Sequence, residues 1–258
     1  MRKKMKKRPL STIMVFHYLK LCFRSALFFG ALLMYIVGRV QGMESPLGEV
    51  RQWPVFLTII WFVFVTEMIL RSIPSRYESM GCQKQFRLNH IEVSGASGKP
   101  QLQSWKTTFA VTAVWLALNS VFGILYYLGV FDAGIMLLIA LAYSVCDMIC
   151  ILFFCPFQTW FMKNKCCGTC RIYNWDYAMM FTPLIFVPTF YSWSLVLLAL
   201  AILLRWEVTY RRHPERFSEN TNGALECRNC REKLCHHKTQ LRQFWKKNRI
   251  RTRHSEKF

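Results

Sequence analysis

Residues 173–208 read YNWDYAMMFTPLIFVPTFYSWSLVLLALAILLRWEV, and whether this apolar stretch forms one helix or two decides the topology of the chain. It is long enough for one long tilted helix, or for two short helices that turn near VPTFYSWS. Pro183 and Pro188 favour two helices, because a proline interrupts the helical hydrogen-bond ladder. A hairpin of this kind returns the chain to the side from which it started.

The rest of the chain has the composition of an integral membrane protein. Of its 258 residues 53% are hydrophobic, yet the formal net charge is +20. The apolar residues form four further runs, and the basic residues lie between the runs. Each run is long enough to cross a hydrocarbon core of about 30 Å, the first only with residues borrowed from the stretch before it. These runs cover 25–40, 53–70, 107–130 and 133–155.

The distribution of basic residues selects among the topologies. With six helices and both termini cytoplasmic, all but two of the 34 basic residues lie on the inner side, including Lys20 and Arg24. Only Arg39 and Arg51 face outward, as the positive-inside rule requires. We therefore expect an all-α, polytopic helical bundle of about six spans, the last two short, in the cell (inner) membrane. A shallow re-entrant hairpin and one long helix remain alternatives for residues 173–208.

This topology divides the chain into segments with different surroundings. The termini are basic, and we expect them to bind anionic lipid headgroups, at about 1 kcal/mol per residue near the surface, rather than nucleic acid. The helices would contact the bilayer and a membrane protein partner. The segments are a basic N-terminus with an amphipathic lead (1–24), a four-helix core (25–155) with a cytoplasmic loop (71–106), a Cys-rich cytoplasmic loop (156–176), a short helical hairpin (177–208) and a basic Cys-rich cytoplasmic tail (209–258).

With this topology, all eleven cysteines would fall in the inner half of the membrane or on its inner face. Structural disulfides belong to oxidising compartments, so thiols on a reducing face favour metal ligation or redox chemistry. Small apolar packing and lipid modification are the alternative interpretations.

Two CxxC units stand out among these cysteines, in KCCGTC at 165–170 and ECRNCREKLCHH at 226–237. The last hairpin would bring them together, and four thiolates satisfy a tetrahedral ion. We expect a small cytoplasmic metal-binding module that holds zinc, with an iron–sulfur cluster as the alternative. The predicted ligands are Cys166, Cys167, Cys170, Cys227, Cys230 and Cys235, with His236 and His237 beside them.

Asp147, in AYSVCDMICILFFC, is the candidate catalytic residue. An ionisable group in hydrocarbon is costly unless it is paired, so it either has a function or locks the bundle by pairing with Arg71, Arg171 or another interfacial base. The chain has no nucleophile triad and no nucleotide-binding glycine pattern, which leaves enzymatic activity open. We expect a membrane metalloprotein in redox chemistry or metal and thiol handling. The alternative is a non-catalytic scaffold or complex subunit in which structural zinc staples loop to tail.

Overall fold

The computed structural model describes residues 11–47, 54–93, 99–164, 166–235 and 238. Its framework is five apolar helices, each long enough by length and composition to cross a membrane. Within the described ranges there is no strand, only an isolated bridge between Glu92 and Asn222. The all-helical prediction is therefore confirmed. The long helices are α1 (Thr12–Val40), α2 (Pro54–Arg71), α4 (Trp105–Tyr127), α5 (Ala133–Leu152) and α7 (Phe190–Arg212).

Side-chain caps fix where these helices begin. Ser11 accepts a hydrogen bond from the backbone of Met14, and Asp132 caps α5 in the same way. Because α1 starts directly after Ser11, the amphipathic lead is part of the same helix as the first apolar run. The short elements are α3 (Met80–Gln83), α6 (Asp176–Phe181), η1 (Arg87–Asn89), η2 (Phe157–Phe161), η3 (Tyr173–Trp175), η4 (Thr182–Phe186), η5 (Pro214–Phe217), η6 (Gly223–Leu225) and η7 (Cys227–Asn229).

The prediction of six spans is wrong in number, and the difference lies in residues 173–208. This stretch contains one long helix, α7, preceded by the short helix α6 and the single turn η4. Pro183 stands in the first turn of η4, and Pro188 precedes the cap of α7, where Thr189 accepts from the Ser192 backbone. The two prolines therefore shape the turn as expected, but the arm before it is too short to qualify as a span.

The α6–η4 arm still runs along the bundle before the chain turns back. Phe186 packs its ring against Tyr127 of α4, with centroids 6.1 Å apart. A Cβ atom at Gly123 would lie 2.5 Å from the same ring, so α4 needs a glycine there. At the other end, the Trp206 indole of α7 donates to the Arg171 carbonyl at 3.0 Å. The chain therefore doubles back, and residues 171 and 206 lie side by side.

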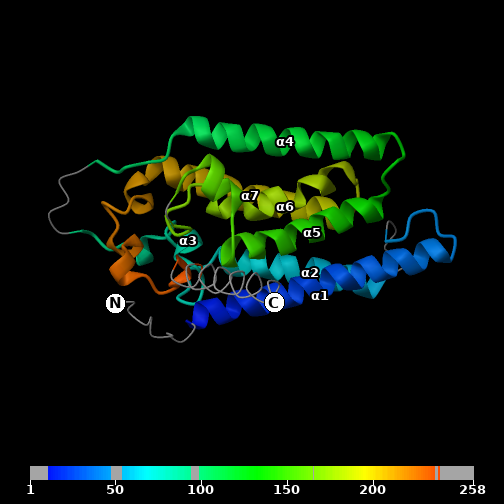
Figure 1. Cartoon of the computed structure of the whole chain (residues 1–258), viewed down its shortest axis with the longest axis horizontal. Helices are drawn as coiled ribbons and strands as arrows, with labels where there is room; N and C mark the ends of the chain where they lie inside the picture. Colours follow the sequence, from blue (N-terminus) through cyan, green and yellow to red (C-terminus); the bar gives the residue numbers. More distant parts are fainter. Residues whose placement is uncertain (1–10, 48–53, 94–98, 165, 236–237, 239–258) are drawn as a thin grey trace, which may run out of the picture.

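One end of the bundle collects the Cys-rich segments, and we call it the cysteine end. It contains the start of α1, the ends of α2 and α5, helix α3, the loop before α6 and the segment that follows α7 (Figure 1). The Ser11 hydroxyl donates to the Glu232 carbonyl at 3.1 Å, so the beginning of α1 meets residues more than two hundred positions later. The first and last described segments therefore share one end of the bundle.

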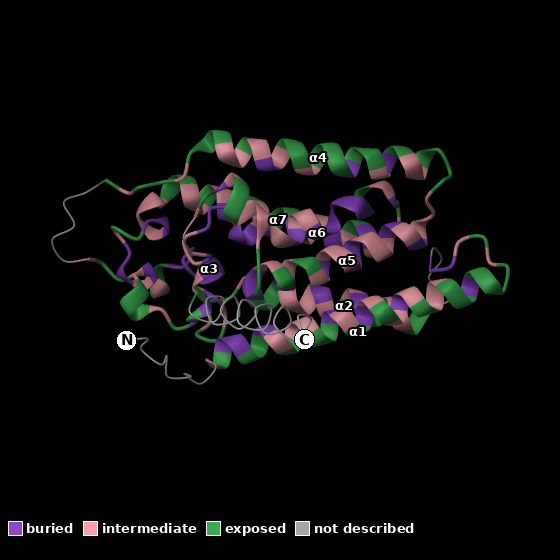
Figure 2. Ribbon diagram, viewed as in Figure 1, coloured by how far each residue is buried: buried purple, intermediate pink, exposed green. Residues whose placement is uncertain are grey.

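Burial shows which faces of the helices pack together. Buried side chains line the contacts among α1, α2, α5, α6 and α7, and exposed ones follow the outer face of α4 (Figure 2). Large apolar side chains remain exposed on the outside of the long helices, among them Phe29, Phe62, Phe109 and Leu197. An apolar outer surface is what helices in contact with lipid require. The structure is therefore compatible with a multi-pass membrane protein.

Candidate functional site

The polar centre of the bundle is Arg24 of α1, whose side chain is 0% exposed. Its guanidinium donates to the Glu67 carboxylate of α2 at 2.6 Å, the Asp147 carboxylate of α5 at 3.1 Å and the Ser144 carbonyl at 3.1 Å. The Tyr177 hydroxyl of α6 adds a bond to Glu67 at 3.1 Å. Arg24 thus connects α1 with α2 and α5, and Tyr177 adds α6 through Glu67. The acids have the partner that apolar surroundings demand.

Asp147 is therefore paired with Arg24, rather than with Arg71 or Arg171, the two bases named from the sequence. Arg71 donates instead to Asp176 of α6, and Arg171 donates to Glu207 of α7. The pairing agrees with a role in locking the bundle, and the catalytic role of Asp147 stays a prediction. In the sequence this pair is indicated only by the arginine within LKLCFRSALFFG, at the end of the amphipathic lead.

The loop that contains the first CxxC is held by a buried lysine. The Lys84 ammonium, which follows α3, donates to the carbonyls of Gly168 and Cys170, both at 2.8 Å. Burial lowers the pKa of Lys84 to about 8, while the neighbouring Cys170 acts in the opposite direction. Lys84 lies over the Trp206 ring at 5.3 Å, so the lysine also ties the loop to α7. Nothing in the local sequence distinguished this lysine from the other basic residues of its loop.

The segment that contains the second CxxC is held by a buried acid. The Glu232 carboxylate accepts from the Ser79 hydroxyl at 2.7 Å and from the Met80 backbone at 2.6 Å, at the start of α3. Burial raises its pKa. Glu232 and Lys84 therefore fasten the tail segment and the loop to the same short helix.

Five cysteines from these two segments line one cavity of about 460 Å³, which we call the loop–tail cavity. Their distribution differs from the predicted set of ligands. Cys170 lines a separate cavity on the bundle side, so the two CxxC units do not both converge on one point. The physical reason is the Lys84 clamp, which holds the Cys170 backbone against α3. The cysteines of the loop–tail cavity are Cys166, Cys167, Cys227, Cys230 and Cys235.

Two pairs of cysteines at the cysteine end influence each other's pKa. Cys235 raises the pKa of Cys166, and Cys166 lowers that of Cys235. Cys155, just beyond α5, is influenced by Cys150 in the last turns of that helix. Cys150, with help from the Gln158 backbone amide, lowers the pKa of Cys155 to about 7.

Backbone amides also point at several of these sulfur atoms. Gly168 donates to the Cys166 sulfur at 3.3 Å, and Lys233 donates to the Cys230 sulfur at 3.4 Å. Such N–H bonds stabilise a thiolate and orient it as a ligand. Backbone amides therefore orient one sulfur in each of the two segments, those of Cys166 and Cys230.

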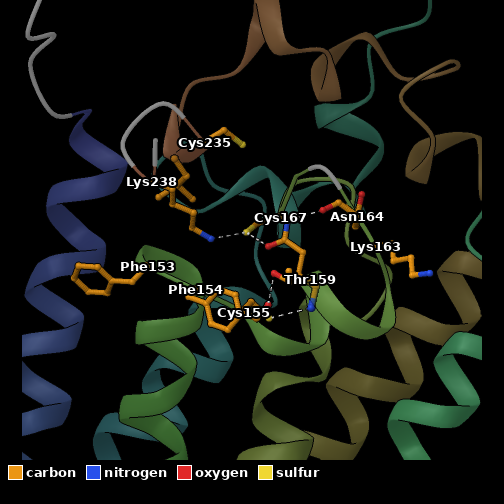
Figure 3. A pocket seen from close by; sticks show the side chains of 11 residues that line it. Phe153, Phe154, Cys155, Thr159, Lys163, Asn164, Cys167, Cys235 and Lys238 are labelled. Carbon is orange, nitrogen blue, oxygen red and sulfur yellow. Dashed lines mark hydrogen bonds between the residues drawn. The ribbon is translucent and has the colours of Figure 1, made fainter. Parts of the chain in front are cut away.

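A third cavity of about 380 Å³ lies beside these thiols and contains Lys238 (Figure 3). The Lys238 ammonium donates to the Cys150 carbonyl at 3.2 Å and contacts the Cys167 sulfur at 3.5 Å. Burial nevertheless raises the pKa of Cys167 to about 12, and Lys238 opposes that shift. Cys155, Cys167 and Cys235 line this Lys238 cavity together, which connects the two thiol pairs.

Within the described residues, no three or more His, Cys, Asp or Glu side chains are arranged to hold a metal ion. His236 and His237, which sequence reasoning placed beside the ligands, lie outside those residues. The structure brings thiols together in two pairs, around cavities that share lining residues. Comparison with known proteins adds no function, because no family model, no curated protein and no solved structure matches this chain.

Proposed function

We propose that this integral membrane protein binds a metal ion through thiolates at the loop–tail cavity and acts in metal or thiol handling. The observation that carries the proposal is the meeting of five cysteines, from segments about sixty residues apart, around one cavity. Cys166 and Cys235 line it from the two different segments, and the Cys230 sulfur accepts the Lys233 backbone amide. Zinc is the ion we expect, because a thiolate-rich site in a basic protein segment is typical of it, with an iron–sulfur cluster as the alternative.

The surroundings we propose follow from the same arrangement. The cysteine end lies on the cytoplasmic face of the cell (inner) membrane, because the basic residues between the apolar runs gather there. The basic termini bind anionic lipid headgroups, although both lie outside the described residues. The exposed apolar helix faces contact lipid and a membrane protein partner.

Metal analysis of anaerobically purified protein tests the proposal. We expect about one zinc ion per chain, or iron with visible absorbance if a cluster is bound. Replacing Cys166 and Cys235 together by serine should abolish the metal, while Cys22→Ser, at an exposed position of α1, should keep it. A metal-free wild type, or equal metal in the double variant, would contradict the proposal.

A scaffold without catalytic function is the second candidate, and one observation favours it. Glu232 and Lys84 already fasten loop and tail to α3 through buried hydrogen bonds. In that case zinc would only reinforce a connection that exists without it. Cys166→Ser with Cys235→Ser, tested in the host, separates the two: a scaffold keeps its function when the variant still folds, whereas a protein that works through the metal loses it.

A further inference from the structure

A second sulfur-rich cavity lies inside the bundle, between the end of α5, η2 and α6. It has a volume of about 260 Å³ and we call it the bundle cavity. Five thiols line it, those of Cys146, Cys150, Cys155, Cys167 and Cys170. The thioethers of Met179 and Met180 belong to the same wall. Seven sulfur atoms around one small cavity are far more than apolar packing of a helix end requires.

The fold directs two of these thiols to the same cavity. Cys150 belongs to α5, and the chain folds back after Leu152, with the Phe154 amide bonded to the Ile149 carbonyl at 3.2 Å. This turn brings Cys155 back toward Cys150, and both thiols line the bundle cavity. The Gln158 backbone amide donates to the Cys155 sulfur at 3.3 Å. Both thiols are thus placed at one cavity by the fold, and a backbone amide orients one of them.

The chemistry of the lining selects a class of ion. Soft thiolate and thioether ligands favour monovalent copper, whereas zinc in structural sites takes four ligands. Within the described residues no group of three or more candidate ligands is assembled, but a monovalent soft ion needs only two thiolates. Lys238 beside the pair, bonded to the Cys150 carbonyl at 3.2 Å, offsets the negative charge of two thiolates around one Cu(I).

We propose that the bundle cavity is a Cu(I) site in which Cys150 and Cys155 are the ligands and the two methionine thioethers complete the soft lining. The two ligands do not line the loop–tail cavity, although Cys167 lines both cavities, so the site does not depend on zinc being there. Cys155 and Cys167 also line the Lys238 cavity, which reaches Cys235. An ion that enters the Lys238 cavity near Cys235 therefore meets the thiols of Cys167 and Cys155.

The test is a Cu(I) titration of the full chain, reduced and anaerobic in detergent, against a chromophoric copper chelator. Cys150→Ser with Cys155→Ser should lose one tightly bound Cu(I) per chain relative to wild type, with the zinc content unchanged. Cys22→Ser is the matched control and should bind as wild type does. Equal copper uptake by the double variant and the wild type would overturn the proposal, whatever the zinc measurement gives.

Two further measurements keep the proposal testable if the double cysteine variant fails to fold. Met179→Leu with Met180→Leu conserves volume and should weaken Cu(I) binding by about tenfold without changing its stoichiometry. In wild type, phenylarsine oxide should bridge Cys150 and Cys155, and prior Cu(I) loading should block that bridge in peptide mapping. A bridge that forms equally well with and without copper would contradict the assignment.

Discussion

The Arg24 network and the sulfur-lined cavities differ in the charges of their polar groups. Arg24 donates to three acceptors on two other segments of the bundle, and two of these are the carboxylates of Glu67 and Asp147. The cysteines instead gather groups of one kind, five of them around the loop–tail cavity of about 460 Å³. Opposite charges that are buried together are costly to separate, so the network acts on the stability of the fold. Thiols that share a cavity can act together as ligands of a soft metal ion.

The largest effect should come from removing the cation of the Arg24 network. Arg24→Met leaves Glu67 and Asp147 without their shared partner in apolar surroundings, at a cost of about 3 to 5 kcal/mol in the free energy of unfolding. Thermal and denaturant unfolding in detergent measure it. Adding Glu67→Gln and Asp147→Asn should restore most of the loss, because no unpaired charge then remains. A single Arg24→Met variant as stable as wild type would show that the network is not structural.

Lys84→Met should have the next largest effect, and it acts on the clamp rather than on the bundle. The carbonyls of Gly168 and Cys170 lose a charged donor, which should cost about 2 kcal/mol. The freed loop should also expose Cys170 to maleimide faster than in wild type. Lys84→Arg is the control for charge. Unchanged maleimide kinetics in Lys84→Met would mean that the loop is held by other contacts.

Glu232→Gln should weaken the attachment of the tail segment to α3 more modestly. The glutamine side chain keeps one acceptor oxygen for the Ser79 hydroxyl and the Met80 backbone N–H but loses the negative charge. We therefore expect a loss of about 1 kcal/mol in the free energy of unfolding. Limited proteolysis of the tail measures the change. Glu219→Gln, on the same polypeptide segment but outside this contact, provides the comparison. Equal proteolysis of the two variants would argue against the Glu232 anchor.

The smallest expected effect is a shift in the reactivity of one thiol. Because the pKa of Cys155 is lowered to about 7, its alkylation rate in metal-free protein should rise about tenfold from pH 6 to pH 8. Cys150→Ala removes the main influence that lowers this pKa, so the midpoint should move to higher pH. Mass spectrometry of the Cys155 peptide follows the reaction. A midpoint that does not move would remove Cys150 as the cause.

The features that the sequence predicted correctly are those that local pattern determines. The apolar runs predicted the long helices, and the prolines at 183 and 188 predicted the turn that brings loop and tail together. The count of six spans was too high because hydropathy alone does not show that Pro183 limits the first arm to a short helix and one turn.

The site could be predicted only in part, because its partners are far apart in the sequence. Cys166, Cys167 and Cys230 were expected at one place and do line one cavity. The position of Cys170 depends on Lys84, and the pairing of Asp147 depends on Arg24 from another helix. No spacing rule connects residues 24 and 147, or 84 and 170. Their contacts follow from helix packing, which sequence periodicity does not specify.

The meeting of loop and tail is tested most directly by cross-linking in intact membranes. In a Cys167→Ser chain, treatment with dibromobimane and peptide mapping should give an intramolecular link between Cys166 and Cys235, which both line the loop–tail cavity. Brief labelling with a membrane-impermeant maleimide should place both residues on the same face of the bilayer. If the two cysteines are each modified singly, on opposite faces and without a link, the loop and the tail do not form one site.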